Sequence, residues 1–513
     1  MASTLSYSSS IPLKRPRDGS ISSVHDPPPP APPPATSQRF KNSIVLAPMV
    51  RSGTMPTRLL ALKYGASLVW GPEIIDKAML HAKRVVDEKT GIVSFEGISS
   101  SIWSCHPAER PYLIYQIGSS SPPLAVAAAL LVSRDVSGVD LNCGCPKPFS
   151  TSGGMGAALL DTPDILCDIL TSLRAALPPH ISVSCKIRLL PDPQKTLDLV
   201  ERIVKTGISC LTVHCRTRNM RKGERAIPDR LRAIVDFVRS MRDESGNPYD
   251  VAVLANGDVE GWSDIQRVKD ITGADGLMVA TKAEENPSCF SETMVDVDEL
   301  VSRYLRIARY TSNTFGNTKH CISSFKSAPG VVNQRAALKA LRTTIAQAKD
   351  YPSFTTFMLE RHAAEVANGT RSGEFDEENW GGDKEIEGIV DSIKSRPPPA
   401  WWVGVEEWER ANPLESQGMD VDIGEDGIKK LLERDREERP RKKSKVDPAD
   451  VKTSVPTHPG TATETPSHTT NPEPGALATP GPLFMSYVPP MVAGRNERSP
   501  SPERAVSKAT LIS

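Results

Sequence analysis

Eight short runs of apolar and β-branched residues recur along the chain. They lie at residues 43–49, 67–71, 113–118, 138–142, 183–188, 210–214, 251–257 and 276–280. Each run is almost continuously apolar, as expected for parallel strands that are buried on both faces. Segments with helical periodicity separate the runs, and they include residues 163–177 and 229–242. The pattern therefore predicts strands that alternate with helices.

Eight strands that alternate with helices over about 250 residues are typical of a (β/α)8 TIM barrel. An open, doubly wound parallel sheet is the alternative fold. That fold usually carries a GxGxxG motif after its first strand, and the chain lacks one there. We therefore predict an α/β fold, in which a (β/α)8 TIM barrel is followed by a smaller helical domain.

Composition divides the chain of 513 residues into five parts. Residues 1–40 contain nine prolines and residues 411–513 are rich in Pro, Ser, Thr and charge, so we predict disordered tails at both ends. The barrel is expected at 41–295 and a basic helical domain at 296–365. Residues 366–410 form an acidic and Trp-rich extension, which we expect to pack back on the folded body.

The overall charge gives no information about binding partners, because the chain has 62 Lys and Arg residues and 62 Asp and Glu residues. No apolar run approaches the roughly 20 residues that span a bilayer, so we expect no membrane segment. The nine cysteines show no framework of spaced pairs, which is typical of a protein in a reducing compartment.

Residues 301–349 carry nine Lys or Arg residues and no Asp or Glu. Helical spacing places several of these cations on common faces: Arg303, Arg306 and Arg309 in one set, and Arg335, Lys339 and Arg342 in another. Such a segment in a neutral protein indicates a surface for a polyanion, most plausibly nucleic acid. A solvated helix face is the alternative interpretation.

Residues that could take part in catalysis or ligand binding follow nearly every predicted strand. In a TIM barrel the active site is built at the carboxyl ends of the strands. Any one of these residues could be an ordinary loop residue, but together they predict a functional site. The strand-end residues are Pro48, Met49, Glu73, Gln116, Asn142, Cys145, Lys186, Arg188, His214, Arg216, Asn256, Gly257, Ala280 and Thr281.

Cys143 and Cys145 are separated by one glycine. Zinc sites and redox dithiols normally have two or more residues between paired cysteines, so neither is expected, and we predict no metal site. One thiol can point into the barrel mouth while the other packs. An ordinary thiol is mostly protonated near neutral pH and can donate a proton, although Lys147 would lower its pKa. The glycine-rich loop 149–156 has the composition of a mobile lid.

Lys186, Arg188 and His214 would place positive charge in the barrel mouth. Fixed cations there would stabilise an anionic cofactor, such as a reduced flavin, or a developing enolate.

Five segments resemble the flavin-dependent tRNA-dihydrouridine synthases. They are, in order, residues 43–76, 140–160, 185–188, 212–218 and 254–258. The resemblance extends over roughly residues 42–350 and is strongest to the eukaryotic branch that acts on uridine 20. It implies FMN as cofactor, NADPH or NADH as reductant and tRNA as substrate. Hydride would reach C6 of uracil, a cysteine would protonate C5, and the target base would be flipped out of the tRNA.

The resemblance assigns roles residue by residue. The cysteine before proline in the N-x-G-C-P motif is Cys145, the proton donor, and Cys143 falls on the variable position. The positions implied to bind FMN are Pro48, Met49, Gln116, Asn142, Lys186, His214, Asn256, Gly257, Ala280 and Thr281. The positions expected to bind substrate or tRNA are Arg188, Arg216, Arg303, Arg306, Lys319, Arg335, Lys339 and Arg342.

The chain departs from the family pattern at some positions. Thr281 stands where an arginine is typical, and Cys215 stands where a glycine is common. No match to the double-stranded-RNA-binding domain of the animal relatives is found in the tail. Two other functions therefore stay open: an FMN barrel that reduces a small molecule, and a tRNA-binding relative that has lost its flavin. We expect a monomer in the cytoplasm, the nucleus or both, with a mitochondrial location not excluded.

Overall fold

A computed structural model describes residues 36–221, 223–328, 335–396, 399–411 and 425–438. Eight parallel strands follow one another in sequence order around the barrel, and the pairing of Val69 with Leu113 closes the ring. This closure confirms the (β/α)8 TIM barrel and excludes an open sheet. The strands are β1 (Ile44–Leu46), β2 (Leu68–Trp70), β7 (Leu113–Gly118), β8 (Gly138–Cys143), β9 (Ser182–Leu189), β10 (Cys210–Thr217), β11 (Ala252–Asn256) and β12 (Gly276–Val279).

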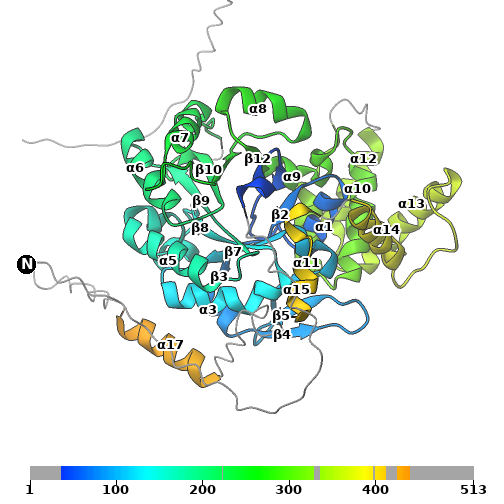
Figure 1. The fold of residues 1–513 in the computed structure, drawn as a ribbon. Coiled ribbons are helices and arrows are strands. Elements are labelled where there is room, and N and C mark those ends of the chain that lie inside the picture. Colours follow the sequence, from blue (N-terminus) through cyan, green and yellow to red (C-terminus); the bar gives the residue numbers. More distant parts are fainter. Residues whose placement is uncertain (1–35, 222, 329–334, 397–398, 412–424, 439–513) are drawn as a thin grey trace, which may run out of the picture. The chain divides into compact units, whose positions relative to one another are not determined.

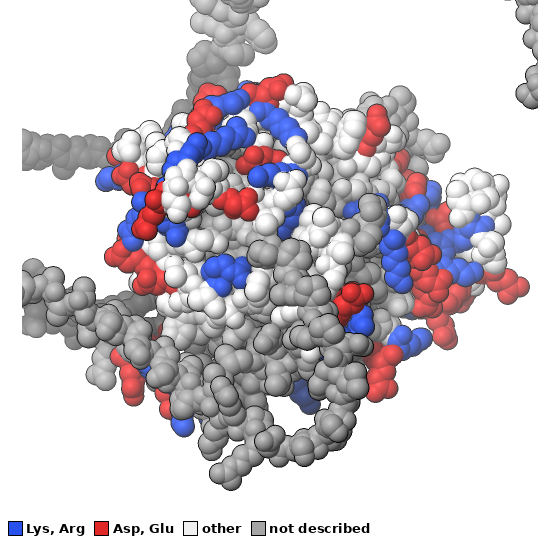
Figure 2. All heavy atoms as spheres, viewed as in Figure 1, with Lys and Arg blue, Asp and Glu red and all other residues white. Residues whose placement is uncertain are grey.

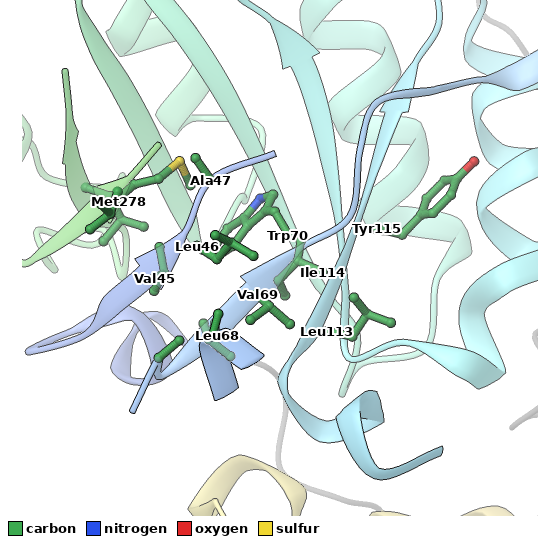
Figure 3. Close-up of a cluster of buried hydrophobic side chains, with 14 of the residues drawn as sticks. Val45, Leu46, Ala47, Leu68, Val69, Trp70, Leu113, Ile114, Tyr115 and Met278 are labelled. Carbon is green, nitrogen blue, oxygen red and sulfur yellow. The ribbon is translucent and has the colours of Figure 1, made fainter. Parts of the chain in front are cut away.

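All eight predicted apolar runs coincide with these strands. Every residue of β1, β2, β7, β8, β11 and β12 is buried, since the barrel interior covers one face and the helices cover the other. Figure 3 shows this packing for side chains of β1, β2 and β7, with Met278 of β12 beside the residues of β1. Burial of each large apolar side chain contributes about 1.5–3 kcal/mol.

Helices surround the strands, with α10 to α14 to one side (Figure 1). Proline stands in the first turn of several helices, where its missing N–H costs no hydrogen bond. The barrel helices are α1 (Met55–Lys63), α2 (Asp76–Leu80), α3 (Pro122–Val132), α4 (Pro148–Thr151), α5 (Pro163–Ala176), α6 (Pro193–Val204), α7 (Pro228–Ser240), α8 (Ile265–Thr272) and α9 (Thr281–Glu285).

An insertion between β2 and β7 was not predicted. Strand β3 (Ile74–Ile75) pairs with β7, and β4 (Lys83–Val86), β5 (Val93–Glu96) and β6 (Ser101–Cys105) form a separate antiparallel sheet. The ring of Trp103 lies 5.2 Å from that of Tyr115, so this small sheet packs on the barrel wall. Its sequence signal was the alternation of apolar and polar residues in β5, after the turn at Gly91.

The predicted helical domain is present. It contains α10 (Val297–Tyr310), α11 (Phe315–Ser324), α12 (Arg335–Gln347) and α13 (Thr355–Ala367). Helix α14 (Gly382–Lys394) belongs to the acidic extension, and it packs against both α10 and α1. The extension therefore joins the helical domain to the barrel.

The Trp-rich segment packs on the amino-terminal end of the barrel, as expected. Trp401 donates a hydrogen bond from Nε1 to the carbonyl of Pro111 over 3.2 Å, just before β7. Trp402 is buried, with its ring 5.1 Å from the guanidinium carbon of Arg110. Arg110 also pairs with Glu409 of α15 (Val405–Ala411). This segment therefore covers the end of the barrel opposite the predicted site.

Two predicted boundaries of the disordered tails were wrong. Residues Ser37–Phe40 form a short 3₁₀ helix, in which Phe40 is fully buried and Arg39 donates to the carbonyl of Ser137. Helix α17 (Glu425–Glu438) lies inside the predicted tail and packs against α3. Its apolar residues Ile428, Leu431 and Leu432 recur at helical spacing and meet the core, which explains its order. The rest of both predicted tails lies outside the described residues.

Candidate active site

The register of the strands brings the predicted strand-end residues together. Asn142 of β8 is paired with Lys186 of β9, and His214 of β10 is paired with Asn256 of β11. Arg188 is the register partner of His214. Alternate residues of a strand face the same side, so these five side chains belong to the barrel interior at the carboxyl ends of the strands.

A hydrogen-bonded belt of polar side chains lies beneath this layer. Asp140 accepts from Gln116 Nε2 over 2.8 Å and from Ser184 Oγ over 2.6 Å. Gln116 Oε1 in turn accepts from Asn142 Nδ2 over 3.3 Å. Burial raises the pKa of Asp140 to about 6. Asp140 and Ser184 were not predicted from the sequence. Each lies two residues before a predicted interior residue of the same strand, Asn142 or Lys186, and so faces the same side.

Asn142 fixes the loop that carries Cys145. Its Oδ1 accepts from the backbone N–H of Gly144 over 2.9 Å and of Cys145 over 3.1 Å. Arg188 Nε donates to the carbonyl of Gly144 over 2.8 Å, and Arg188 also donates to the carbonyl of Thr217. Arg188 was expected to bind substrate or tRNA, but here its guanidinium holds the cysteine loop in place.

The two cysteines of the motif are unequal. Cys143 is fully buried and lies on the outward-facing side of β8 with Leu141, whereas Cys145 is half-buried. Burial and then the negative charge of Glu73 raise the pKa of the Cys145 thiol to about 11. The lowering expected from Lys147 is outweighed, so the Cys145 thiol is protonated at neutral pH.

Glu73 lies behind this thiol. Its Oε1 accepts from Ser150 Oγ over 2.8 Å, and burial raises the pKa of its carboxyl. The loop that follows Cys145 contains α4 and is held at a second point, where Ser120 Oγ donates to the carbonyl of Gly153 over 2.8 Å. The predicted movement of this loop as a lid stays a prediction.

His214 is neutral in the site. Burial, together with the charges of Lys186, Arg188 and Arg216, lowers its pKa to about 2. Arg216 Nη1 lies 3.2 Å from His214 Nε2. Because a guanidinium can only donate, Nε2 must accept and the proton must be on Nδ1. His214 is therefore uncharged and carries an N–H donor at Nδ1.

Gly257 makes room beside this imidazole. Its φ is +107°, and a Cβ at this position would lie 3.1 Å from His214 Cδ2. Arg216, which was expected to bind substrate or tRNA, is buried, forms an ion pair with Asp258 and donates to the carbonyl of Glu224. Its role in this structure is to orient the loops after β10 and β11.

The first and last strands complete the ring of candidate residues. Leu46 is paired with Val279, so Pro48 and Met49 after β1 lie beside Ala280 and Thr281 after β12. Thr281 is exposed at the start of α9, and Lys282 lies 3.7 Å from the carboxylate of Glu260.

The residues of the mouth fit the flavin that the resemblance implies. Lys186 forms no ion pair with a described residue within 4 Å, and burial followed by the charge of Arg188 lowers its pKa to about 8. An unpaired cation, the N–H of His214 and the amides of Gln116 and Asn142 suit the oxygen and nitrogen atoms of a flavin ring. The missing Cβ of Gly257 allows the His214 imidazole to lie in this position.

A model of the family described as dihydrouridine synthase (Dus) matches residues 45–366. This chain belongs to the dihydrouridine synthase family. The match includes the whole barrel from β1 onward and most of the helical domain through α13. The family assignment expected from the five sequence segments is therefore confirmed.

Relatives of this dihydrouridine synthase family member include two yeast proteins, each named tRNA-dihydrouridine(20) synthase (NAD(P)+). The one from Schizosaccharomyces pombe is 45% identical over 312 residues, which are 59% of this chain and 64% of that protein. The chain thus spans just under two thirds of its length. The one from Saccharomyces cerevisiae is 40% identical over 305 residues, 55% of this chain and 77% of that protein. Among solved structures, the old yellow enzyme from Trypanosoma cruzi matches 48% of this chain and 86% of its own, with 12% identity and a TM-score of 0.31.

Part of the basic segment of this dihydrouridine synthase family member is paired with acids that lie outside residues 301–349. Arg303 pairs with Glu299 and Glu385, and Arg306 is buried against Glu365. Figure 2 shows acidic and basic side chains intermixed where α13 and α14 lie in Figure 1. Arg303 and Arg306 were expected to bind tRNA, but in this structure they join α10 to α13 and α14.

The same network lines a cavity of about 340 Å³ between these helices rather than at the barrel mouth. Lys63 at the carboxyl end of α1 also lines it, so the cavity lies beside the opposite end of the barrel from Cys145. Its guanidinium groups are engaged by carboxylates, and it is a polar gap in the ion-pair network.

Other predicted tRNA contacts divide into two groups. Lys319 donates to the carbonyls of Ala346 and Ala348 at the end of α12, and Arg342 donates to those of Ser323 and Phe325. These two cations fix helix ends. Lys339, in contrast, is exposed and forms no side-chain hydrogen bond or ion pair with a described residue. The side chain of Arg335 lies outside the described part of the chain.

The described part of the chain lacks two kinds of feature. No group of three or more His, Cys, Asp or Glu side chains is arranged there to hold a metal ion. No helix there is long and apolar enough to cross a bilayer.

Proposed function

We propose that this protein reduces the C5–C6 double bond of a tRNA uridine to give dihydrouridine, with FMN as cofactor and NADPH or NADH as electron source. One observation carries the proposal: a protonated, half-buried Cys145 is fixed by Asn142 beside a mouth that fits a flavin. Family membership and the names of the two yeast relatives support it.

The chain's own residues have distinct roles in this reaction. Gln116, Asn142, Lys186, His214 and Gly257 would hold FMN, which supplies a hydride for C6 of the uracil. The cation of Lys186 and the N–H of His214 would stabilise negative charge at the ring edge. Cys145 Sγ holds the proton that C5 receives, and its raised pKa keeps that proton on sulfur at neutral pH.

Uridine 20 is the proposed position, because it is the position in the names of both yeast relatives. The base must leave the tRNA stack to reach Cys145. Lys339 is the cation of α12 that we propose as a phosphate contact, since it is exposed and free of described partners. We further propose that the protein acts as a monomer in the cytoplasm, the nucleus or both.

The test is mass-spectrometric mapping of dihydrouridine in tRNA that lacks the modification. Incubation with the purified protein, FMN and NADPH should produce dihydrouridine at position 20. Modification elsewhere would correct the position. A protein that binds no flavin even after FMN is added would favour a non-catalytic tRNA-binding relative. A flavoprotein without salt-sensitive tRNA affinity would favour a small-molecule reductase.

A further inference from the structure

Glu73 is an acid in the site for which the reaction described above gives no role. It follows β2 by three residues and is only 7% exposed. Its Oε1 accepts from Ser150 Oγ, whereas its buried Oε2 has no hydrogen-bond partner in the described part of the chain. A buried carboxylate oxygen without a partner is costly, so an additional donor is expected there.

Two glycines allow the carboxyl to approach the cysteine loop. A Cβ at Gly118 of β7 would lie 2.6 Å from Glu73 Oε1. A Cβ at Gly156, whose φ is +57°, would lie 2.6 Å from the carbonyl oxygen of Cys145. A larger residue at Gly118 would displace the Glu73 carboxyl, and one at Gly156 would displace Ser150 or Cys145. The two glycines therefore leave room for these three residues to lie close together.

Cys145 belongs to the same cluster as Glu73, because a Cβ at Gly156 would clash with Ser150 Oγ, which donates to Glu73, and would lie 3.2 Å from Cys145 Cβ. Its thiol is the candidate donor for the partnerless oxygen. The interaction between the two groups lowers the pKa of the Glu73 carboxyl and raises the pKa of the Cys145 thiol. These directions are expected when an S–H group donates to a carboxylate. The charged groups that interact electrostatically with Cys145 are Glu73, Lys186 and Arg188. The cations oppose the effect of Glu73, and burial together with Glu73 outweighs them.

We propose that Glu73 is a positioning residue that keeps the Cys145 thiol protonated and restores its proton after each turnover. This inference rests on the proposed function. When the thiol gives its proton to C5, the S–H bond breaks, the C5–H bond forms and the sulfur is left as a thiolate. A proton taken up from the solvent by the Glu73 carboxylate then passes to that thiolate, so each turnover consumes one solvent proton and regenerates the thiol.

The test follows alkylation of Cys145 by iodoacetamide against pH in the full-length protein without tRNA. Only the thiolate reacts, so the midpoint of the rate reports the ionisation of the thiol, and peptide mass spectrometry isolates Cys145 from the other cysteines. In the unmodified protein the midpoint should lie above that of an ordinary thiol. E73Q should lower the midpoint, so that alkylation at pH 8 becomes about tenfold faster. E73D, which keeps the charge, should restore slow alkylation, and E88Q, at an exposed glutamate, should change nothing.

An ordinary or lowered midpoint in the unmodified protein would overturn the inference without any variant, even if E73Q failed to fold. A folded E73Q protein with the same midpoint would overturn it as well. Single-turnover formation of dihydrouridine should fall in E73Q and recover in E73D. The proposed function is tested separately with C145A. If C145A still produced dihydrouridine, Cys145 would not be the proton donor. If C145A lost activity while E73Q kept an unchanged midpoint, only the role inferred for Glu73 would be rejected.

Discussion

The guanidinium of Arg306 donates two hydrogen bonds to the carboxylate of Glu365, from Nη1 to Oε1 over 3.1 Å and from Nη2 to Oε2 over 2.9 Å. These residues are 59 positions apart and join α10 to α13. Arg306 also donates to the carbonyl of Trp380. A cation that the sequence assigned to tRNA is therefore part of the interior of the helical domain.

Loss of this carboxylate should destabilise the helical domain. In E365Q the buried Arg306 loses its main counter-charge, so we expect the free energy of unfolding in urea to fall by on the order of 3 kcal/mol. E360Q, on an exposed residue of the same helix, should stay within about 0.5 kcal/mol of the unmodified protein. Equal stability of E365Q and E360Q would show that this ion pair is not structural.

The neutral His214 should make the protein sensitive to acid. Its pKa of about 2 lies below the value of about 6.5 in an unfolded chain. The unfolded state therefore takes up a proton below pH 6.5 that the folded state does not, and stability falls as the pH falls. Between pH 7 and pH 5 the flavin-free protein should lose about 2 kcal/mol more than H214Q in urea unfolding. Parallel losses in the two proteins would argue against a neutral His214.

G257A should impair both stability and flavin retention. Its φ of +107° strains any residue with a Cβ, and that Cβ would approach His214. We expect a loss of roughly 1–3 kcal/mol in unfolding free energy and reduced flavin absorbance after FMN is added. The control is G316A in α11, where a Cβ meets nothing within 4 Å, so stability should be unchanged or slightly higher. Full flavin content in G257A would remove Gly257 from the proposed cofactor site.

The two motif cysteines should differ in their effect on turnover. C145A should abolish formation of dihydrouridine while tRNA binding persists, because only the proton donor is removed. C143A should retain activity and lose about 1 kcal/mol of stability, since Cys143 only packs behind β8. Mass-spectrometric assay of both variants checks this, and an inactive C143A with an active C145A would reverse the assignment.

Lys339 should act through charge alone. In K339A the affinity for tRNA should fall, and the slope of log affinity against log salt concentration should decrease by about 1, because one phosphate contact is lost. K195A, at an exposed lysine of α6 on the outer wall of the barrel, is the matched control. If both variants kept the slope of the unmodified protein, α12 would not be part of the tRNA surface.

The sequence by itself determined the elements of the barrel and the chemistry at its mouth. Short apolar runs that alternate with helical segments are typical of buried parallel strands, and the residues after each run are carried to the same end of the barrel. This logic found Cys145, Lys186 and His214. It passed over Asp140 and Ser184, because a polar residue within an apolar run gives no local sign that a partner lies on the next strand.

Only the tertiary structure decided which charges are available to a partner. The segment 301–349 has no acids of its own, but folding brings Glu365 and Glu385 against Arg303 and Arg306. Pairing over such distances along the chain depends on how helices pack, which local periodicity does not encode. The same holds for Glu73, which the sequence marked only as a strand-end acid, and which the glycines at 118 and 156 allow to lie behind Cys145.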